Sequence, residues 1–278
     1  MDKFRKKNEK PREREAAPEG ELCWGRNPVI SLLEESPERC MKVLVSETMQ
    51  PHVKTKIISL CREAGVVFQN AGQAALDRLT NGENHQGVAA YLTQAKLWDA
   101  DELLEKLPAA PEPVMILLCD HVQDPHNLGA MIRSAEAAGA SAVLIPKRGG
   151  CLPTGTVIKT SAGAALRVPV ALTGNVAQTV RKLQEAGFWV TGLDMNGRDT
   201  LFREDLPPRS AIVVGAEGSG LGTATAKACD DVRLIPMRGT AGSLNASVAA
   251  ASRCSNGRAA WGSARKLSAC ARPRLFAI

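Results

Sequence analysis

Three loops in this sequence combine glycine or asparagine with charged side chains, and each loop follows a stretch that is typical of a buried strand. The first loop runs from Asp120 to Gly129 and leads into a segment with helical spacing that carries Arg133. Asp124 and Asn127 are both suitable N-cap residues, so a capped helix start explains them as well as a binding role does. Because Asn127 and Arg133 are six positions apart, a site that uses both must form from the start of the helix and its second turn.

The second loop, from Gly215 to Gly220, holds three glycines and a central Glu217. Glycines after a strand let the backbone approach a ligand closely. Their G-x-x-G-x-G spacing matches neither the dinucleotide-binding fingerprint nor the phosphate-binding loop of ATPases. A carboxylate at the centre repels an anionic phosphate, so this loop favours a neutral or cationic ligand.

The third loop follows a short apolar stretch ending at Ile235 and leads into a helix that we expect to begin near Ser243. Capping of this helix explains Ser243 by itself. Asn245 and Ser247 match the glycosylation pattern, but this match carries no weight in a protein that we expect in the cytosol.

The elements that must position these loops alternate regularly along the second half of the chain. An apolar run at 114–118 is typical of a strand buried on both faces, and helical and strand patterns then alternate up to residue 235. This rhythm predicts the α/β class, with an open parallel sheet that carries helices on both faces. In such sheets ligands bind beyond the carboxyl ends of the strands, where all three loops lie.

Composition and proline content divide the chain into four parts. These are a charged tail (1–19), a smaller α/β module (20–95), a linker with the proline-rich stretch PAAPEP (96–113) and the larger module (114–278).

The composition also excludes several classes of protein. The chain has 278 residues and 44% hydrophobic residues, enough to bury the cores of two domains. No apolar run is long enough to span a membrane, and the charged start lacks the apolar region of a secretory signal, so we expect a cytoplasmic protein. The eight cysteines lie far apart without a C-x-x-C pair, which predicts free thiols and no metal site. The net charge of +6 arises at the two ends of the chain, so it does not by itself indicate nucleic-acid binding.

A resemblance emerges when the three loops are read in order with their flanks, as DPHNLGAMIRSAEAAG, VVGAEGSGL and IPMRGTAGSLNASVAAA. These segments resemble the three motifs of the SpoU/TrmH family, which are S-adenosylmethionine-dependent RNA ribose 2′-O-methyltransferases with the trefoil-knotted SPOUT fold. The first module, with GRNPVISLLEESPER and NHQGVAAYL, is similar to the L30e-like RNA-binding domain of the branch that modifies a guanosine of 23S rRNA. The resemblance implies S-adenosylmethionine as cofactor, 23S rRNA as substrate and a homodimer, with no metal and no membrane.

The resemblance also implies catalytic roles, for Asn127, Arg133, Glu217, Ser243 and Asn245. Arg133 would contact the target phosphate or ribose and help to activate the 2′-hydroxyl, and Glu217 would hold Arg133 in place. The other three would position groups by hydrogen bonds. A free guanidinium stays protonated and is a poor base, so we expect electrostatic stabilisation from Arg133 and leave the general base open.

Cofactor contacts in the family are largely main-chain contacts. The matching positions are Gly215, Ile235 and Leu244, with Met237 as a wall of the adenine pocket. Without the resemblance, ordinary core packing would explain Ile235 and Leu244.

Candidate RNA contacts lie in the first module. They are Arg26, Asn27 and Arg39 near its start, and His85 and Gln86 in a glycine-bounded loop. These side chains can meet phosphates or base edges, although a solvated loop explains them too. A tRNA ribose methyltransferase and a catalytically inactive RNA-binding protein are the alternative functions.

The chain departs from the family after Ala251. Residues 252–278 hold six basic residues, two glycines, one proline and no acidic residue, without a sustained apolar helical period. This composition resembles an out-of-frame reading of a GC-rich gene, with a divergent basic RNA-binding tail as the alternative. Under the frameshift hypothesis the last helix loses its apolar face, and we expect a flexible 252–278, weak dimerisation and low activity.

Overall fold

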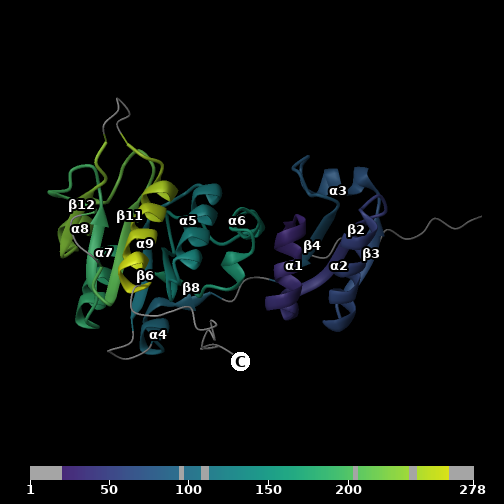
Figure 1. Cartoon of the computed structure of the whole chain (residues 1–278), viewed down its shortest axis with the longest axis horizontal. Helices are drawn as coiled ribbons and strands as arrows, with labels where there is room; N and C mark the ends of the chain where they lie inside the picture. The colour runs from purple at the N-terminus through teal and green to yellow at the C-terminus, as the bar shows by residue number, and fades with distance from the viewer. Residues whose placement is uncertain (1–20, 94–96, 108–112, 203–205, 238–242, 263–278) are drawn as a thin grey trace, which may run out of the picture.

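The computed structural model describes residues 21–93, 97–107, 113–202, 206–237 and 243–262, with the backbone alone for 255–262. Two β-sheets organise these residues, one in each of the two lobes seen in Figure 1.

Four strands form the smaller sheet, in the order β1 (Glu21–Trp24), β4 (Val88–Leu92), β2 (Cys40–Ser46) and β3 (Val67–Ala71). β4 is antiparallel to both of its neighbours, whereas β2 and β3 are parallel. The accompanying helices are α1 (Arg26–Glu35), α2 (Pro51–Glu63) and α3 (Gln73–Leu79), with a 3₁₀ helix at Pro37–Arg39. The apolar β4 is buried along its whole length because helices and neighbouring strands cover it.

All eight strands of the larger sheet run parallel. Their order is β10 (Asp199–Thr200), β12 (Asp231–Leu234), β9 (Trp189–Leu193), β11 (Arg209–Gly215), β6 (Val114–Asp120), β7 (Ala142–Pro146), β8 (Val170–Thr173) and β5 (Trp98–Asp99). The central β6 is buried at every position, as a continuous apolar run requires. The predicted α/β class with a parallel sheet is confirmed.

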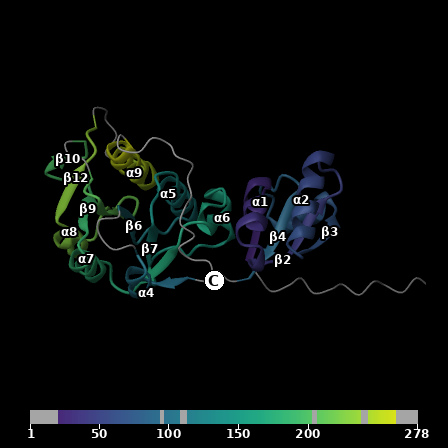
Figure 2. The ribbon, with the colours of Figure 1, turned by 60° about the horizontal axis from the view of Figure 1, so that its bottom comes forward.

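Helices cover both faces of this sheet (Figure 2). One face carries α5 (Pro125–Ala137), α6 (Gly155–Thr160), a 3₁₀ helix (Ala164–Leu166) and α9 (Ala246–Gly262). The other carries α4 (Ala100–Glu105), α7 (Val176–Glu185) and α8 (Thr223–Ala228). Two apolar cores therefore sandwich the sheet and leave its carboxyl edge to the loops.

The short helix α6 joins the two modules. Ile158 belongs to the apolar core of the first module, although it lies in the sequence of the second. Gly155 packs so tightly there that a Cβ atom would lie 1.8 Å from the Leu22 carbonyl oxygen. Lys159 Nζ forms an ion pair with Glu83 Oε2 over 2.5 Å. The contact between the modules is thus both apolar and ionic.

The last helix corrects one expectation. α9 continues to Gly262, so 252–262 is helical rather than flexible, and 263–278 lies outside the described residues. Arg253 and Cys254 are both buried against the sheet, with Arg253 only 1% exposed. An arginine therefore occupies a buried position of α9, where its Nη1 donates a 2.8 Å hydrogen bond to the Leu201 carbonyl. Ala246, Ala250 and Cys254 still pack an apolar face of α9 into the core, and the frameshift hypothesis stays a prediction.

Two further observations concern only the described part of the chain. None of its helices combines the length and apolar character that crossing a membrane requires. No group of histidine, cysteine and carboxylate side chains there is arranged to hold a metal ion.

Candidate active site

Parallel pairing brings the motif loops to one edge of the larger sheet. β6 and β11 lie in register, so that Asp120 is opposite Gly215, and β9 pairs with β11 so that Leu193 is opposite Val214. The first and second motifs therefore leave the sheet side by side. β12 runs parallel to β9, so its carboxyl end, which precedes Ile235, lies at this edge too.

The start of α5 resolves an alternative that the spacing left open. Asp124 caps the helix, because its side chain accepts a 3.0 Å hydrogen bond from the His126 amide, and Pro125 occupies the first turn. Asn127 has no capping role and is 7% exposed. Its amide is available to the other motifs.

Asn127 joins the three motifs. Its Nδ2 donates a 2.8 Å hydrogen bond to Glu217 Oε2, and its Oδ1 accepts a 2.8 Å hydrogen bond from Asn245 Nδ2. Asn245 also accepts a 2.8 Å hydrogen bond from the Ser247 amide at the start of α9. The expected cap at Ser243 is wrong, because α9 begins at Ala246 and Asn245 fills that role. We call the connected side chains the Glu217–Asn127–Asn245 chain.

The glycines of the second motif allow a very tight loop. A Cβ atom on Gly215 would lie 2.1 Å from the carbonyl group of Gly220, so no larger residue fits. Gly218 and Gly220 have φ values of +82° and +65°, in the left-handed region that favours glycine. The Gly220 amide donates to the Ala216 carbonyl over 3.0 Å and closes the loop behind Glu217.

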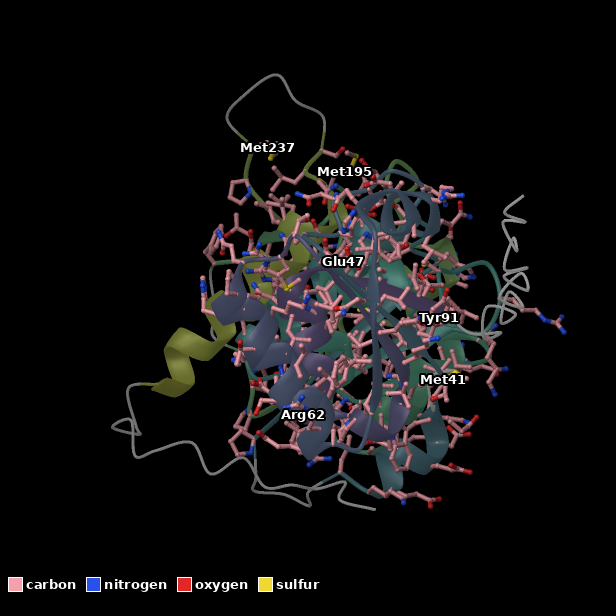
Figure 3. All side chains as sticks on the ribbon, turned by 90° about the vertical axis from the view of Figure 1, so that its right-hand side faces the viewer. Met41, Glu47, Arg62, Tyr91, Met195 and Met237 are labelled. Atoms are coloured by element: carbon pink, nitrogen blue, oxygen red, sulfur yellow. The ribbon has the colours of Figure 1, made fainter. Side chains whose placement is uncertain are left out.

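A pocket opens at this edge, between the motif loops and the loop after β9. All four predicted cofactor positions line it: Gly215, Ile235, Met237 and Leu244. Glu217 and Ser243 line it too. Met195 and Met237 lie at the same end of the molecule, on neighbouring loops (Figure 3). The pocket therefore combines apolar side chains with the exposed backbone of a glycine loop.

Sequence reasoning missed one carboxylate in the pocket, Asp194. Its Oδ1 accepts 2.9 Å hydrogen bonds from the amide and the side chain of Asn196, and its Oδ2 accepts one of 3.3 Å from the Leu221 amide. Asp194 thus ties the loop after β9 to the end of the second motif. A polar Asp-x-Asn-Gly turn directly after an apolar strand was the signal that could have found it.

Among the described residues that line the pocket, carboxylates determine the charge. Asp194 and Glu217 are both carboxylates that line it, whereas the Arg233 guanidinium that also lines it forms an ion pair with Asp231. This balance favours a cationic ligand, as the sequence suggested for the second loop.

The expected contact between Glu217 and Arg133 is wrong within the described residues. Glu217 accepts from Asn127, and no hydrogen bond or ion pair joins it to Arg133 in this part of the chain. Arg133 lies exposed on α5. Six residues separate it from Asn127, which turns its side chain about 120° around the helix from that of Asn127.

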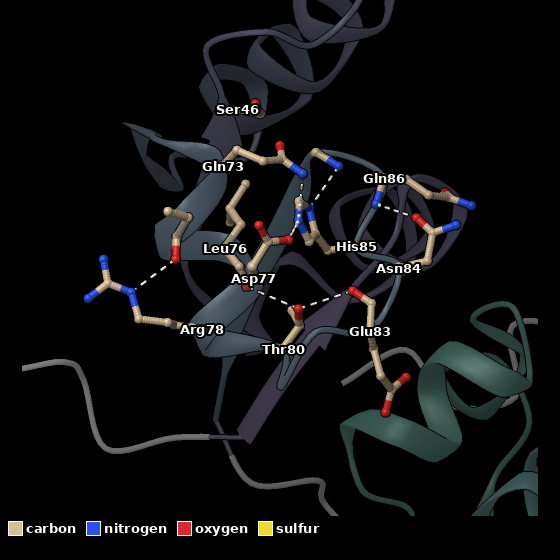
Figure 4. A network of polar contacts seen from close by, with 12 residues as sticks. Ser46, Gln73, Leu76, Asp77, Arg78, Thr80, Glu83, Asn84, His85 and Gln86 are labelled. Carbon is tan, nitrogen blue, oxygen red and sulfur yellow. Dashed lines mark hydrogen bonds and ion pairs between the residues drawn. The ribbon is translucent and has the colours of Figure 1, made fainter.

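The glycine-bounded loop of the first module rests on a buried histidine (Figure 4). His85 is 3% exposed; its Nε2 lies 3.0 Å from Asp77 Oδ1, and its Nδ1 accepts a 3.0 Å hydrogen bond from the Gly87 amide. Since Nδ1 accepts, Nε2 carries the proton and donates to Asp77. His85 therefore stabilises the loop from the protein interior.

Gln86 connects this loop to the start of α1. Its side-chain oxygen accepts a 2.9 Å hydrogen bond from the Arg26 amide, and its carbonyl accepts a 3.3 Å hydrogen bond from Arg26 Nε. Asn27 follows and is exposed. Arg39 lies apart from these residues, beyond the other end of α1, in a cavity between the modules. Burial lowers the pKa of its guanidinium, and Glu21 opposes this shift.

Comparison with known proteins identifies these modules. Residues 114–254 match the SpoU rRNA methylase family, and residues 22–98 match a domain described as RNA 2′-O ribose methyltransferase substrate binding. The fold and the site thus define a two-module protein that joins a methylase module to a substrate-binding module. The chain belongs to the SpoU rRNA methylase family.

Curated relatives cover most of the chain. It is 37% identical to the 23S rRNA (guanosine-2′-O-)-methyltransferase RlmB of Salmonella typhimurium over 82% of this chain and 94% of the relative. It is 41% identical to the RlmB of Xanthomonas campestris over 81% of this chain and 90% of the relative.

Solved structures agree with the fold. An RNA 2′-O ribose methyltransferase matches with a TM-score of 0.71 and 26% identity, over 85% of this chain and 86% of that one. The SpoU methyltransferase AviRb of Streptomyces viridochromogenes matches with a TM-score of 0.72 and 22% identity, over 88% and 91% of the two chains.

Proposed function

We propose that this chain transfers a methyl group from S-adenosylmethionine to the ribose 2′-oxygen of a guanosine in 23S rRNA. The observation that carries this proposal is the Glu217–Asn127–Asn245 chain at the rim of a negatively charged pocket. The named activity of relatives at 37–41% identity supports the same reaction and substrate.

The pocket fits the cofactor. Its apolar wall, with Ile235, Met237 and Leu244, suits an adenine ring, and the close approach of Gly215 and Gly220 keeps backbone groups within reach of it. When bound, S-adenosylmethionine supplies an electrophilic methyl group on a positively charged sulfur. The carboxylates Asp194 and Glu217 complement that charge.

The protein's own side chains position the reacting ribose. Asn127 is hydrogen-bonded on both sides and fixes Glu217 relative to α9. This edge of the pocket is therefore already ordered before RNA binds. Arg133 is exposed and available to an RNA phosphate or ribose near the reacting 2′-hydroxyl. As a fixed positive charge it would stabilise the oxyanion that forms as the hydroxyl proton leaves.

The first module would hold the RNA. Near the start of α1 lie Arg26, Asn27 and, from the glycine-bounded loop, Gln86. These side chains would form the surface of the first module that contacts RNA. We place its boundaries at 20–95 and those of the catalytic module at 114–278, with 96–113 as linker. We further propose a homodimer, since Leu244 and Val248 expose apolar side chains at the start of α9, and a cytoplasmic location, where rRNA is modified.

Methyl transfer from labelled S-adenosylmethionine to purified RNA tests the proposal. We expect incorporation into unmodified 23S rRNA and none into tRNA, with the label at a guanosine ribose. Incorporation into tRNA alone would support a tRNA methyltransferase instead. RNA binding without any binding of S-adenosylmethionine by calorimetry would identify an inactive RNA-binding protein.

A further inference from the structure

A strained histidine stands at the carboxyl end of β6, at the start of the first loop and before the residues that carry the family resemblance. His121 has a φ of +59°, in the left-handed region where a Cβ atom clashes with the backbone. Non-glycine residues persist there only where the surroundings hold them, and such positions cluster at functional sites. The mechanism described above makes no use of this residue.

A buried carboxylate holds the histidine ring. Asp120 is 2% exposed; its Oδ1 accepts a 2.6 Å hydrogen bond from His121 Nδ1, and its Oδ2 accepts a 2.9 Å hydrogen bond from the Gly222 amide. Both carboxylate oxygens are thereby used, which fixes the proton on Nδ1 and leaves Nε2 for another partner. The His121 side chain is 55% exposed, so that partner can come from outside the protein.

The neighbouring loop makes room for this ring and adds charge. Gly149 lies against it, since a Cβ atom on Gly149 would be 2.9 Å from His121 Cδ2. Lys147 and Arg148 precede this glycine at the end of β7, and both are exposed. Lys147 Nζ forms an ion pair with Asp99 over 3.0 Å, whereas Arg148 has no carboxylate partner among the described residues.

The position relates this pair to the cofactor pocket. Asp120 is paired in register with Gly215, which lines the pocket, so His121 leaves the sheet one strand away from it. The pocket itself is negatively charged, and β7 follows β6 in the sheet. Along the carboxyl edge, the two carboxylates at the pocket are thus followed by the exposed guanidinium of Arg148 close to His121.

We propose that His121 and Arg148 form a phosphate subsite for the substrate RNA on the catalytic module, beside the target nucleotide. We call it the rim site. Arg148 would meet a backbone phosphate with its guanidinium, and the exposed Nε2 of His121 would contact the same phosphodiester while Nδ1 stays on Asp120. The proposal rests on the proposed function and adds contacts outside the first module.

His121→Gly tests the rim site because glycine adopts a left-handed backbone without strain. The variant relieves the backbone strain but removes the partner of Asp120 Oδ1, so its melting temperature is measured beside Kd to separate a loss of RNA binding from a loss of folding. We expect the Kd for a 23S rRNA fragment with the target guanosine to rise about 5- to 10-fold, as loss of one hydrogen bond at an exposed site implies. The affinity for S-adenosylmethionine should not change.

Salt dependence separates a phosphate contact from other effects. For Arg148→Gln the slope of log Kd against log salt should fall by about one. Arg181→Gln removes an exposed arginine from α7, on the opposite side of the sheet, and should leave both Kd and slope unchanged. In steady-state assays the two rim-site variants should raise KM for RNA more than they lower kcat.

Two failures can be told apart. A wild-type chain that neither binds nor methylates the rRNA fragment overturns the proposed function and the rim site with it. A wild type that does both, beside a His121→Gly variant with unchanged Kd and an Arg148→Gln variant with unchanged salt slope, overturns the rim site alone. If the two variants bind inorganic phosphate more weakly than wild type but bind RNA equally well, His121 and Arg148 bind a small anion instead. That result would also overturn the rim site.

Discussion

Replacing Asn127 by Asp tests the central contact of the site one atom at a time. Asp keeps the oxygen that accepts from Asn245 Nδ2, but it replaces the Nδ2 that donates over 2.8 Å to Glu217 by a second oxygen. Only one hydrogen bond of the Glu217–Asn127–Asn245 chain is therefore inverted, with almost no change of shape. Two carboxylates then face each other where an amide met a carboxylate.

The magnitude follows from the two effects. Loss of a hydrogen bond to a charged group costs about 1.5–3 kcal/mol. Repulsion of two unit charges about 4 Å apart adds up to roughly 4 kcal/mol at an effective dielectric constant of 20. Glu217 is exposed and can turn towards water, so most of the repulsion is relieved. We expect a net loss of about 2–3 kcal/mol at pH 8, which lowers the melting temperature by about 4–12 °C.

The stability of the Asn127→Asp variant should depend on pH, with a direction set by the two carboxylates. Two facing carboxylates raise each other's pKa in the folded variant, so protonation is easier there than in the unfolded chain. The repulsion is then present at pH 8 and disappears as the pH falls, and the variant should recover part of its stability near pH 5.

Thermal unfolding of wild type and variant at pH 8 and pH 5 measures this effect. Asn175→Asp is the matched control, because Asn175 caps α7 by accepting a 3.0 Å hydrogen bond from the Gln178 amide and Asp accepts equally well. An Asn127→Asp variant as stable as wild type at pH 8, or one whose deficit is the same at both pH values, would refute the role given to Asn127.

Four further outcomes follow from the same structure. Arg133→Ala should abolish methyl transfer without changing the melting temperature or cofactor affinity, because the side chain is exposed on a helix; near-normal turnover would remove Arg133 from the mechanism. Gly129→Ala should cost about 1–3 kcal/mol of unfolding free energy by denaturant titration, since the new Cβ would lie 1.9 Å from Thr160 Oγ1 and force α5 from α6. Burial raises the pKa of Cys23 to about 12, so its thiol should resist alkylation at pH 8 by mass spectrometry, and its contribution to stability should be lost as the pH rises from about 9 towards 12. Arg253→Leu should raise the melting temperature, because burying a guanidinium that is 1% exposed costs more than its 2.8 Å hydrogen bond to the Leu201 carbonyl returns; a fall would show that the arginine belongs there.

The larger sheet was predictable because its strands are buried on both faces. Such strands read as continuous apolar runs, and the run at 114–118 became the centre of β6. Among the described elements, those that escaped prediction include β1, α3, the two-residue strands β5 and β10, and the 3₁₀ helix at Pro37–Arg39. β1 and α3 are short and mixed in composition, and contacts made far along the chain stabilise them. Leu76 of α3, for instance, is buried against Leu44 and Tyr91.

The motif residues were predictable, but their partners were not. Glu217 and Asn127 are 90 residues apart, and only the parallel pairing of β6 with β11 brings their loops together. Helix geometry alone argues against a shared partner for Asn127 and Arg133, since positions six apart point about 120° away from each other around the helix. His85 illustrates the opposite error: a polar residue in a glycine-bounded loop suggested an RNA contact, yet the structure buries it.

The position of Ile158 limits how these modules can be exchanged. In a hybrid enzyme joined at the linker, α6 of the catalytic module would pack against the first module of another protein. Ile158 would then lose its matching apolar core, and Lys159 would lose its ion pair with Glu83. The first module, which matches the substrate-binding domain, therefore cannot be exchanged by a junction at residues 96–113 alone. A working hybrid must carry α6 from the same protein as residues 20–95. Likewise, a chain that evolves a new RNA specificity must keep the contacts of Ile158 and Lys159 with the first module while other surface residues change.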